Sequence, residues 1–411
     1  MYFRAPFALA LALGTFASAA AAASDTAEQL CWDASVYDLD DDGYADYHAP
    51  SDARVTVAVS EALRLTCPAG YVRLRGDCDD SDASVHPRTL EIAFNGIDDN
   101  CDGRVDEPRV RYHYDGFNNT TSGFGLDVRV NDEEVVDAYP AGAGPLLISW
   151  LSAEIEYQDL SDTSVTLTSG PTRVTTFSSW PAYASAELSL SGLDPNRVYR
   201  ARVQFYKTHF VFGAFQHTPV GEQSDWYYTP TDATHARGQA RAEVVLRALY
   251  EMWISAEYGY TGYLGTAYVD GTRYGADMGE AWCSEFYSFN FDWAIGGMGH
   301  RESVSRVTDY FDGYSAFTDV DAGNRASVLA TLKHGDYLAE DTNLDGDVNH
   351  SAMFLAYDSA TDQLITVDGN TVGNSGQGDG FASRRGGNEA FIRERDPDVL
   401  VGWGSIKRSM L

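Results

Sequence analysis

The placement of the five cysteines constrains this chain of 411 residues more than any other feature. Four of them, Cys31, Cys67, Cys78 and Cys101, fall within one N-terminal segment, whereas Cys283 stands alone far downstream. In an exported protein, four closely spaced cysteines predict two disulfides. The fifth is then left over, so it is either a buried small hydrophobic residue or a free reactive thiol.

The N-terminus indicates export. Arg4 precedes an apolar run over residues 5–12, and an alanine-rich stretch ends near Ala23, so we assign residues 1–23 to a signal peptide. A basic residue, a short apolar core and small residues at the exit are typical of such a peptide. No later stretch approaches the roughly 20 apolar residues of a transmembrane helix, so we expect no membrane-spanning segment. The predicted location is extracellular or in the cell envelope, and association with the cell surface is left open.

The charge balance excludes one class of partner. The chain has 61 acidic and 29 basic residues, which gives a formal net charge of -32. Nucleic-acid binding requires a basic surface for the phosphate contacts, so we expect no nucleic-acid partner. The acidic excess suits cation binding or solubility instead.

The chain is too long for one ordinary domain, and three regions follow the signal peptide. Residues 24–108 are acidic, rich in loops and hold four cysteines. Residues 109–220 contain short alternating segments separated by turns, which predicts an antiparallel β-sandwich-like domain. Residues 235–411 begin with apolar residues at helical spacing over Ala242–Ile254 and end in strand-like segments, which predicts an α+β domain.

Alternating aspartates in the first region predict a cation site. Asp38, Asp40, Asp42, Gly43 and Asp46 form the pattern D-x-D-x-D-G-x-x-D. Alternate carboxylates converge on one hard cation where a glycine allows a sharp turn, and calcium takes about six to eight oxygen ligands. The pattern lacks the terminal glutamate of an EF-hand, so the closer analogue is a thrombospondin- or dockerin-like loop. The alternative is an acidic solvated loop in which only the cysteines are structural.

A second run of acidic and small residues follows, with G-D-C-D-D-S-D at 76–82, V-H-P at 85–87 and N-G-I-D-D-N-C-D-G at 95–103. This run resembles the MopE-like metal-binding repeat of exported bacterial proteins. The resemblance implies a compact loop in which Cys78 pairs with Cys101, and Cys31 would then pair with Cys67. Oxygen donors favour calcium over copper, so the expected ion is structural Ca²⁺. The ligands implied are Asp77, Asp79, Asp80, Asp82, Asp98, Asp99, Asn100, Asp102 and Asp106.

The lone cysteine lies where a helix is predicted to begin. Aromatic residues recur at helical spacing after Cys283, from Phe286 to Trp293. A helix N-terminus favours the thiolate, which is the nucleophilic form of cysteine. His350 begins a strand-like segment, and a short turn leads to a second segment that reaches Asp368–Asn370. Pairing the two segments as a hairpin brings the imidazole near a carboxylate or amide, as the orientation of a general base requires.

The last region contains four short motifs, W-C-S-E-F at 282–286, L-K-H-G-D-Y at 332–337, N-H-S at 349–351 and V-D-G-N-T at 367–371. On these motifs, residues from about 240 to 411 resemble a CHAP domain, a papain-like cysteine, histidine-dependent amidohydrolase/peptidase. The resemblance implies Cys283 as the nucleophile, His350 as the base and Asp368 as the residue that orients the base. Asn370 is a substitute or supporting amide. The family more often has glutamate in place of Asp368.

A third acidic pattern precedes the predicted base. The pattern D-x-N-x-D-G-D-x-N runs over 341–349, with Asp341, Asn343, Asp345 and Asp347 as its ligands. Oxygen ligands at every second position predict another calcium site, which would order the loop that carries His350. The alternative is a polar turn between strands.

Together these patterns predict a secreted cysteine hydrolase of amide bonds with a calcium-binding accessory module. The CHAP resemblance implies peptidoglycan or a peptide amide as the substrate, cut between sugar and peptide or within the stem peptide, with no cofactor for catalysis. Two alternatives stay open. One is a calcium-dependent surface or adhesion protein whose CHAP-like domain is not catalytic. The other is a transglutaminase-like acyl transferase with an amine acceptor.

Overall fold

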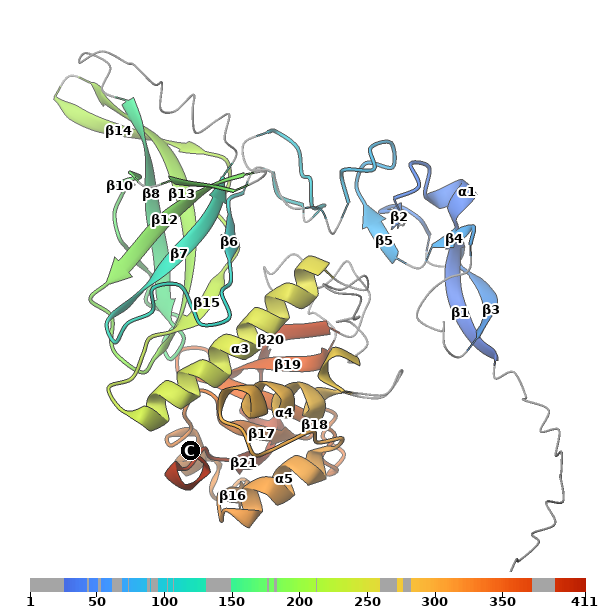
Figure 1. Cartoon of the computed structure of the whole chain (residues 1–411), viewed down its shortest axis with the longest axis vertical. Coiled ribbons are helices and arrows are strands. Elements are labelled where there is room, and N and C mark those ends of the chain that lie inside the picture. Colours follow the sequence, from blue (N-terminus) through green and yellow to red (C-terminus); the bar gives the residue numbers. More distant parts are fainter. Residues whose placement is uncertain are drawn as a thin grey trace, which may run out of the picture.

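Three groups of secondary-structure elements follow one another along the chain (Figure 1). The structure is a computed structural model that describes residues 26–42, 44–50, 53–60, 69–72, 74–86, 89, 95–101, 103–105, 107–130, 149–175, 177–180, 183–211, 213–258, 272–275, 282–371 and 389–411. The predicted signal peptide, Cys67, Asp102 and Asp106 lie outside these ranges. Within them, no helix has both the length and the apolar composition that crossing a bilayer requires.

The N-terminal group is a small module of short strands. Its elements are β1 (Thr26–Asp33), α1 (Ala34–Tyr37), β2 (Tyr44–Asp46), β3 (Val55–Ser60), β4 (Tyr71–Val72) and β5 (Leu74–Asp77). Strand β1 pairs with β3 and β4, and β2 runs parallel to β5. The buried apolar cluster of the module consists only of Trp32, Ala45, Ala49 and Val72 among the described residues. A core of this size requires disulfides or metal ions for stability.

The predicted disulfide between Cys78 and Cys101 is confirmed. Cys31 is also disulfide-bonded. Its predicted partner, Cys67, lies outside the described residues.

Two antiparallel sheets form the middle group. Its strands are β6 (Arg109–Arg111), β7 (Gly123–Val130), β8 (Ser149–Asp159), β9 (Leu167–Thr168), β10 (Thr172–Arg173), β11 (Phe177–Trp180), β12 (Tyr183–Ser191), β13 (Val198–Val211), β14 (Ala214–Val220) and β15 (Tyr227–Pro230). One sheet has the order β10-β8-β13-β14, with β9 beside β8 and β15 beside β13, and the other has the order β11-β12-β7-β6. Alternate residues of β7, β8 and β13, such as Leu126, Ile155 and Val203, share one buried core. The alternating segments thus belong to a sandwich.

The structure extends the sandwich beyond the predicted boundary at residue 220. The predicted domains end at residue 220 and begin again at residue 235, but β15 pairs with β13 between these positions and a helix begins at Ala236. Tyr227 is 2% exposed, and its ring centroid lies 4.5 Å from that of Tyr112. A four-residue strand gives too short an alternation to stand out in a polar segment, so the sequence pattern does not reveal it.

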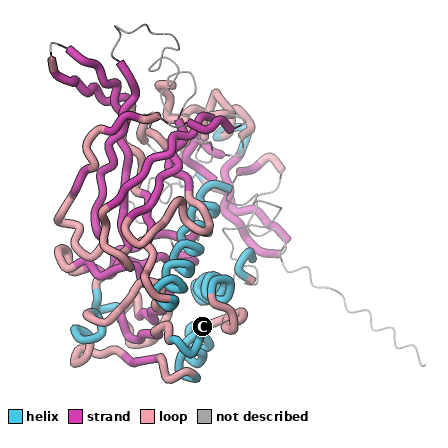
Figure 2. Tube along the Cα trace, turned by 60° about the vertical axis from the view of Figure 1, so that its left-hand side comes forward, coloured by secondary structure: helices cyan, strands magenta, loops and turns pink. Residues whose placement is uncertain are grey.

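The C-terminal group combines helices with one sheet. Its elements are α3 (Ala236–Tyr258), η5 (Thr272–Tyr274), α4 (Cys283–Ala294), α5 (Val304–Gly313), β16 (Phe317–Asp319), α6 (Arg325–Leu329), β17 (Tyr337–Glu340), β18 (His350–Asp358), β19 (Gln363–Thr371), β20 (Glu389–Arg395), η6 (Pro397–Val399), β21 (Leu400–Gly404) and η7 (Arg408–Met410). All strand pairs in the order β16-β21-β17-β18-β19-β20 are antiparallel. Helix α4 packs on β18 and β19, and α3 lies between the sandwich and the sheet (Figures 1 and 2). The apolar core is continuous across this junction.

A buried ion pair ties α3 to the rest of the C-terminal group. Arg241 Nη1 lies 2.5 Å from Asp336 Oδ1, and the two side chains are 5% and 0% exposed. The guanidinium also donates to the backbone oxygens of His334 and Ile406, at 3.1 and 3.0 Å. Asp336 accepts the N–H groups of Lys333 and Ile406. Both charges therefore have several hydrogen-bond partners, as burial demands.

Replacing Arg241 by methionine leaves Asp336 buried without its counter-ion. We expect Arg241→Met to lower the free energy of unfolding by about 3–5 kcal/mol, measured by urea denaturation. Arg306→Met is the matched control, because Arg306 is 61% exposed and lies 4.0 Å from Glu302, so its removal changes stability little. Equal stability of the two variants would contradict a structural role for the buried pair.

Candidate active site and metal-binding loops

Helix α4 begins at Cys283, so the thiol lies at the N-terminal end of a helix, as predicted. Cys283 is 6% exposed and is the free cysteine among the described residues. The first backbone N–H groups of a helix have no partner within it, and their positive end favours a thiolate. Trp282, at the N-cap, is 1% exposed and stacks on Tyr274 at 5.2 Å between ring centroids. Aromatic packing thus fixes where the helix starts.

A buried hydroxyl network fixes the start of α4 on the sheet. Ser284 Oγ lies 2.8 Å from Ser351 Oγ, which in turn lies 3.0 Å from the hydroxyl of Tyr337. The backbone N–H of Ser351 also donates to the sulfur of Cys283. These contacts join α4 to β18 and β17 beside the thiol.

The close approach of β19 to α4 depends on a glycine. A Cβ atom on Gly369 would lie 2.4 Å from Cβ of Phe286 and 2.7 Å from Cζ3 of Trp282. Real Cβ atoms do not approach other carbons so closely, so only glycine fits. Gly369 directly follows Asp368 in β19. Because Gly369 has no side chain, β19 can lie close enough to α4 for Asp368 to be buried beside it.

His350 is the second member of the site. Its Nε2 lies 3.1 Å from Oδ2 of Asp368, and it also hydrogen-bonds to the Cys283 thiol. Because Nε2 faces Asp368, the nitrogen left to face the sulfur is Nδ1. Ala352 is the register partner of Asp368, so the carboxylate lies diagonally across the hairpin from His350. Asn370 belongs to β19, but its side chain lies outside the description.

Two charged residues that the sequence patterns did not single out complete the buried network. Arg395, at the end of β20, contacts Asp368 Oδ2 through Nη2, and its Nε lies 3.2 Å from the same oxygen. The same Nε lies 3.0 Å from Oε2 of Glu340, the register partner of His350. Glu340 and Asp368 are both fully buried. Each of these residues ends a short strand that the sequence patterns do not predict, and a charged residue alone does not indicate its partner.

The surroundings favour a thiolate–imidazolium pair. Burial raises the pKa of Cys283, but the hydrogen bond and charge of His350 outweigh it, so the thiol pKa is lowered. Burial also favours neutral His350, but hydrogen bonds to Asp368 and Cys283 and the charges of both raise its pKa to about 10. A lowered thiol pKa beside a raised imidazole pKa is the pattern of activated cysteines.

The two carboxylates respond differently to burial. For Asp368, the charge of Arg395 and the hydrogen bond from His350 overcome burial and hold its pKa below the usual range. For Glu340, burial dominates over Arg395, and the charge of Asp368 adds to it, which raises the pKa to about 7. Asp368 is therefore the anion that orients His350.

The thiol opens onto a cleft of about 520 Å³. The cleft lies between the start of α4, the start of α5 and one end of the sheet, and its lining residues are Cys283, Ser284, Glu302, Ser303, Val304, Ser305, Thr308, Phe317, Asp319, Ala339, Val348, Asn349 and Val401. Its charged lining residues, Glu302 and Asp319, are both acidic. Cys283 is therefore accessible from this cleft despite its burial.

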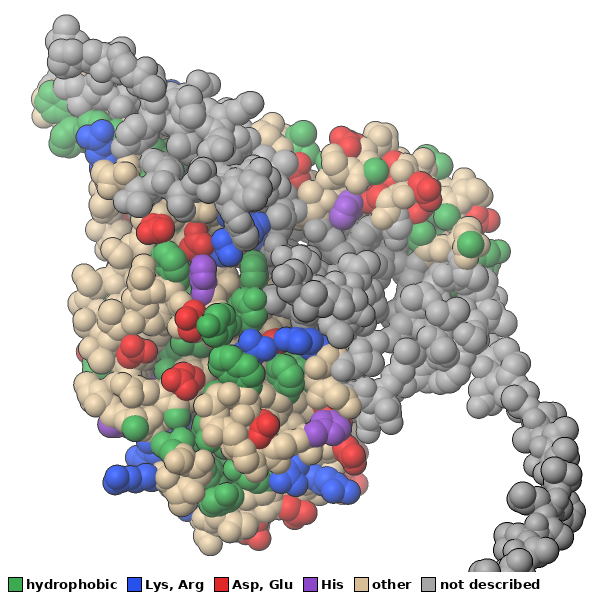
Figure 3. All heavy atoms as spheres, viewed as in Figure 1, with side chains coloured by type: hydrophobic (Ala, Val, Ile, Leu, Met, Phe, Trp, Pro, Cys, Tyr) green, Lys and Arg blue, Asp and Glu red, His purple; other side chains and the backbone are tan. Residues whose placement is uncertain are grey.

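The N-terminal module gathers carboxylates (Figure 3). The ligand atoms of Asp38, Asp40 and Asp42 lie within 4.8 Å of one another, and so do those of Asp40, Asp77 and Asp80. Burial raises the pKa of Asp77 to about 6, and the charges of Asp40, Asp80 and Asp46 add to that effect. Carboxyl oxygens crowded in this way fit a hard divalent cation.

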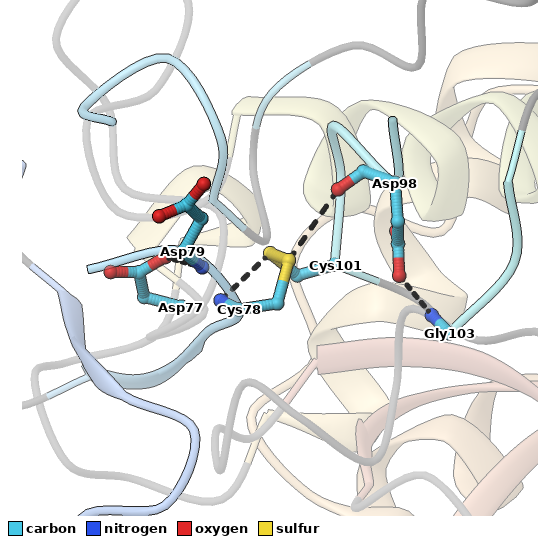
Figure 4. Close-up of a disulfide and its surroundings, with 6 residues drawn as sticks. All are labelled: Asp77, Cys78, Asp79, Asp98, Cys101 and Gly103. Atoms are coloured by element: carbon cyan, nitrogen blue, oxygen red, sulfur yellow. Dashed lines mark hydrogen bonds between the residues drawn. A yellow bond between two sulfur atoms is a disulfide. The ribbon is translucent and has the colours of Figure 1, made fainter. Parts of the chain in front are cut away.

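Other predicted ligands of the module make local hydrogen bonds. Asp98 Oδ2 accepts the N–H of Gly103 at 2.8 Å, on the opposite side of the disulfide from Asp77 and Asp79 (Figure 4). The remaining contacts are Asp46 with His48 N–H, Asp79 with Ser81 Oγ, Asp82 with Ser84 Oγ, Asp99 with Asn95 Nδ2 and Asn100 with Glu107 Oε1.

The loop over 341–349 is an ordered turn. Asp341 Oδ2 accepts the N–H of Gly346 at 2.8 Å, and Asn349 Nδ2 donates to Asn343 Oδ1 at 2.6 Å. Asp345 accepts the N–H of Asp347. In the described part of the chain, the groups of three acidic or histidine ligand atoms within 4.8 Å do not include this loop. Calcium binding there stays a prediction.

The comparisons with known proteins reach only part of the chain. A MopE-type, copper-binding family model described as "Putative metal-binding motif" matches residues 77–107, which confirms that part of the resemblance. No curated protein matches the chain. Similar solved structures include two of the sensor domain of the anti-sigma factor RsgI4 from Pseudobacteroides cellulosolvens. They are 13% and 14% identical, have TM-scores of 0.19 and 0.18, and match 31% of this chain with 76% and 94% of theirs. A third is Astrotactin-2, a perforin-like membrane protein, at 10% identity and a TM-score of 0.19 over 76% of this chain and 49% of that one. These TM-scores carry no argument about fold or function.

Proposed function

We propose that residues 235–411 form a papain-like, CHAP-like cysteine hydrolase that cleaves amide bonds, with peptidoglycan or a peptide as the substrate. The observation that carries this proposal is the chain of contacts from Cys283 through His350 to Asp368, at the edge of a cleft. The N-terminal module would serve as a structural calcium-binding accessory. The Cys78–Cys101 disulfide supports export to an oxidising compartment.

The mechanism follows from the order of these contacts. His350 Nδ1 takes the proton of Cys283, and the thiolate attacks the amide carbonyl carbon. Backbone N–H groups at the start of α4 stabilise the oxyanion. The imidazolium then gives its proton to the leaving amine as the C–N bond breaks, which leaves a thioester on the sulfur. Water, deprotonated by His350, attacks the thioester and releases the acid.

The charges of the cleft favour one kind of substrate. Glu302 and Asp319 line the same cleft as Cys283. Two carboxylates raise the local concentration of cationic groups and disfavour anionic ones. We therefore expect the preferred substrate to carry a free amino group near the scissile amide, as stem peptides with a diamino acid do.

A second candidate function rests on the N-terminal module. The family match covers its acidic repeat, whereas the thiol is 6% exposed. A calcium-dependent surface or adhesion protein with a non-catalytic C-terminal region would use the module and the sandwich but not the sulfur. The two functions differ in whether the thiol is required.

Removing the sulfur tests the hydrolase. Cys283→Ser conserves volume but replaces the thiol by a hydroxyl that His350 does not ionise. We expect hydrolysis of purified peptidoglycan, followed by mass analysis of the fragments, to fall by at least about 10³-fold. An unchanged thermal unfolding midpoint shows that the variant is folded. Wild-type fragment yields from the folded variant would rule out a cysteine hydrolase and favour the adhesion protein.

The pH dependence of thiol alkylation tests the pair without any substrate. The thiolate–imidazolium pair exists between the lowered pKa of Cys283 and the pKa of His350 of about 10. Asp368→Asn removes the charge that stabilises the imidazolium, so thiolate forms only at higher pH. We expect the midpoint of the iodoacetamide rate to rise by about one unit or more.

Asp368→Glu is the matched control for this titration, because it keeps the negative charge and should leave the midpoint near that of the wild type. If Asp368→Asn gives the wild-type profile while its thermal unfolding is normal, Asp368 does not act on the imidazole.

Chelation tests the loop that precedes His350. If calcium orders residues 341–349, excess EGTA lowers the rate of hydrolysis and added calcium restores it. Asp341→Asn should give the low rate with or without calcium. Asp362→Asn, in the turn between β18 and β19, is the control and should respond to EGTA as the wild type does. Full activity in excess EGTA would show that the loop is a polar turn.

A further inference from the structure

The two acidic patterns of the N-terminal module meet at Asp40. This residue belongs to both groups of ligand atoms that lie within 4.8 Å of one another, one with Asp38 and Asp42 and one with Asp77 and Asp80. Ligands on opposite sides of a calcium ion are about 4.8 Å apart, twice a Ca–O distance of about 2.4 Å. Each group therefore has the span that one calcium ion fills.

The backbone holds the two patterns together. Strands β2 and β5 are paired in parallel, with Asp46 beside Asp77 in the register. The N–H of Leu39 donates to Oδ1 of Asp80 at 2.7 Å, and the N–H of Tyr47 donates to the backbone oxygen of Asp77 at 2.6 Å. The meeting of the carboxylates thus follows from the fold of the module.

Asp77 points to a missing cation independently of the clustering. It is 1% exposed, and its Oδ1 accepts the N–H of Asp79 at 2.9 Å. Its Oδ2 is buried and has no hydrogen-bond partner, and the same holds for Oδ2 of Asp40. Among the side chains that the structure describes, which do not include that of Arg75, no Lys, Arg or His forms an ion pair with Asp40, Asp77 or Asp80. A buried carboxylate oxygen with no donor is strongly unfavourable unless it binds a cation.

We propose that the two patterns form one continuous site for hard divalent cations of the calcium class, in which Asp40 is a ligand in both groups. The ligand set is Asp38, Asp40 and Asp42 from the first pattern and Asp77 and Asp80 from the second. The site extends outside the matched motif, which begins at residue 77. It deepens the cation-binding role proposed for the module and is independent of the hydrolase.

Because Asp40 belongs to both groups of ligands, cation binding would connect two parts of the N-terminal module. An ion at Asp40 ties the segment after α1 to the repeat that holds the Cys78–Cys101 disulfide, in a module whose apolar core is small. Without the ion, the same carboxylates repel one another. Cation binding should therefore change the stability of the whole module and not of one loop.

Calcium titration of the full-length mature chain, with its disulfides intact, tests the sharing. Isothermal titration calorimetry should show that Asp40→Asn and Asp77→Asn, one from each pattern, each remove or weaken the same binding event by about ten-fold or more. Asp33→Asn is the matched control, because Asp33 lies in the same module but belongs to neither pattern, and its side chain caps α1 by accepting the N–H of Ser35, which asparagine can also do. It should bind calcium as the wild type does.

The thermal unfolding temperature of Asp40→Asn, compared with that of the wild type, should respond differently in EDTA and in calcium. In EDTA, Asp40→Asn should unfold at a temperature equal to or above that of the wild type, because one repelling charge is gone. In calcium it should unfold below the wild type, because the bound ion stabilises only the intact site. A variant that was merely misfolded would unfold lower in both conditions.

Two results would overturn the proposal, and they are distinguishable. If Asp40→Asn weakens calcium binding but Asp77→Asn does not, the two patterns bind separately and only the sharing fails. If the wild type takes up no calcium in this module, the cation-binding role fails as well. Neither result bears on Cys283.

Discussion

The buried charge of Arg395 is the interaction on which the arrangement around Cys283 depends. Glu340 and Asp368 are both fully buried and both contact the same guanidinium, through Nε and Nη2. Two carboxylates at that depth would repel one another and lose their hydration without compensation. Because Arg395 pairs with both, Asp368 stays ionised and continues to accept the Nε2–H of His350. The orientation of the imidazole, and with it the state of the thiol, therefore originates in a side chain that does not touch the sulfur.

Packing provides the geometry that this charge network needs. Helix α4 meets β18 through the buried contact of Ser284 and Ser351, and it meets β19 where Gly369 has no side chain. Both contacts lie within one residue of the groups that would react. Because packed interiors transmit small changes of volume, a larger side chain at either contact would displace α4 and so move Cys283 relative to His350.

The parts of this structure that the sequence predicts are local ones. The alternation of β7 and β12, the start of α4 at Cys283 and the hairpin of β18 and β19 each follow from a short periodic pattern. Arg395 follows Asp368 by 27 residues, and Leu39 precedes Asp80 by 41. Such contacts depend on strand order, which a single sequence does not encode in any short pattern. The same reason explains why β15 lies outside the predicted sandwich: only its tertiary pairing with β13 marks it as a strand.

The burial of Cys283 also resolves a chemical conflict within the chain. A thiol with a lowered pKa attacks disulfides, and the same chain holds an exposed disulfide half at Cys78. In such an attack, the thiolate sulfur must approach a disulfide sulfur along the axis of the S–S bond. Cys283 is 6% exposed at the edge of a cleft, so only a narrow partner can reach its sulfur. The substrate that we propose, an extended peptide amide, meets that requirement, whereas a disulfide that is fixed in a folded module does not. Burial, which by itself would raise the thiol pKa, is tolerated because His350 and the start of α4 offset it. The packing that limits access to the sulfur of Cys283 thus also supplies the groups that lower its pKa.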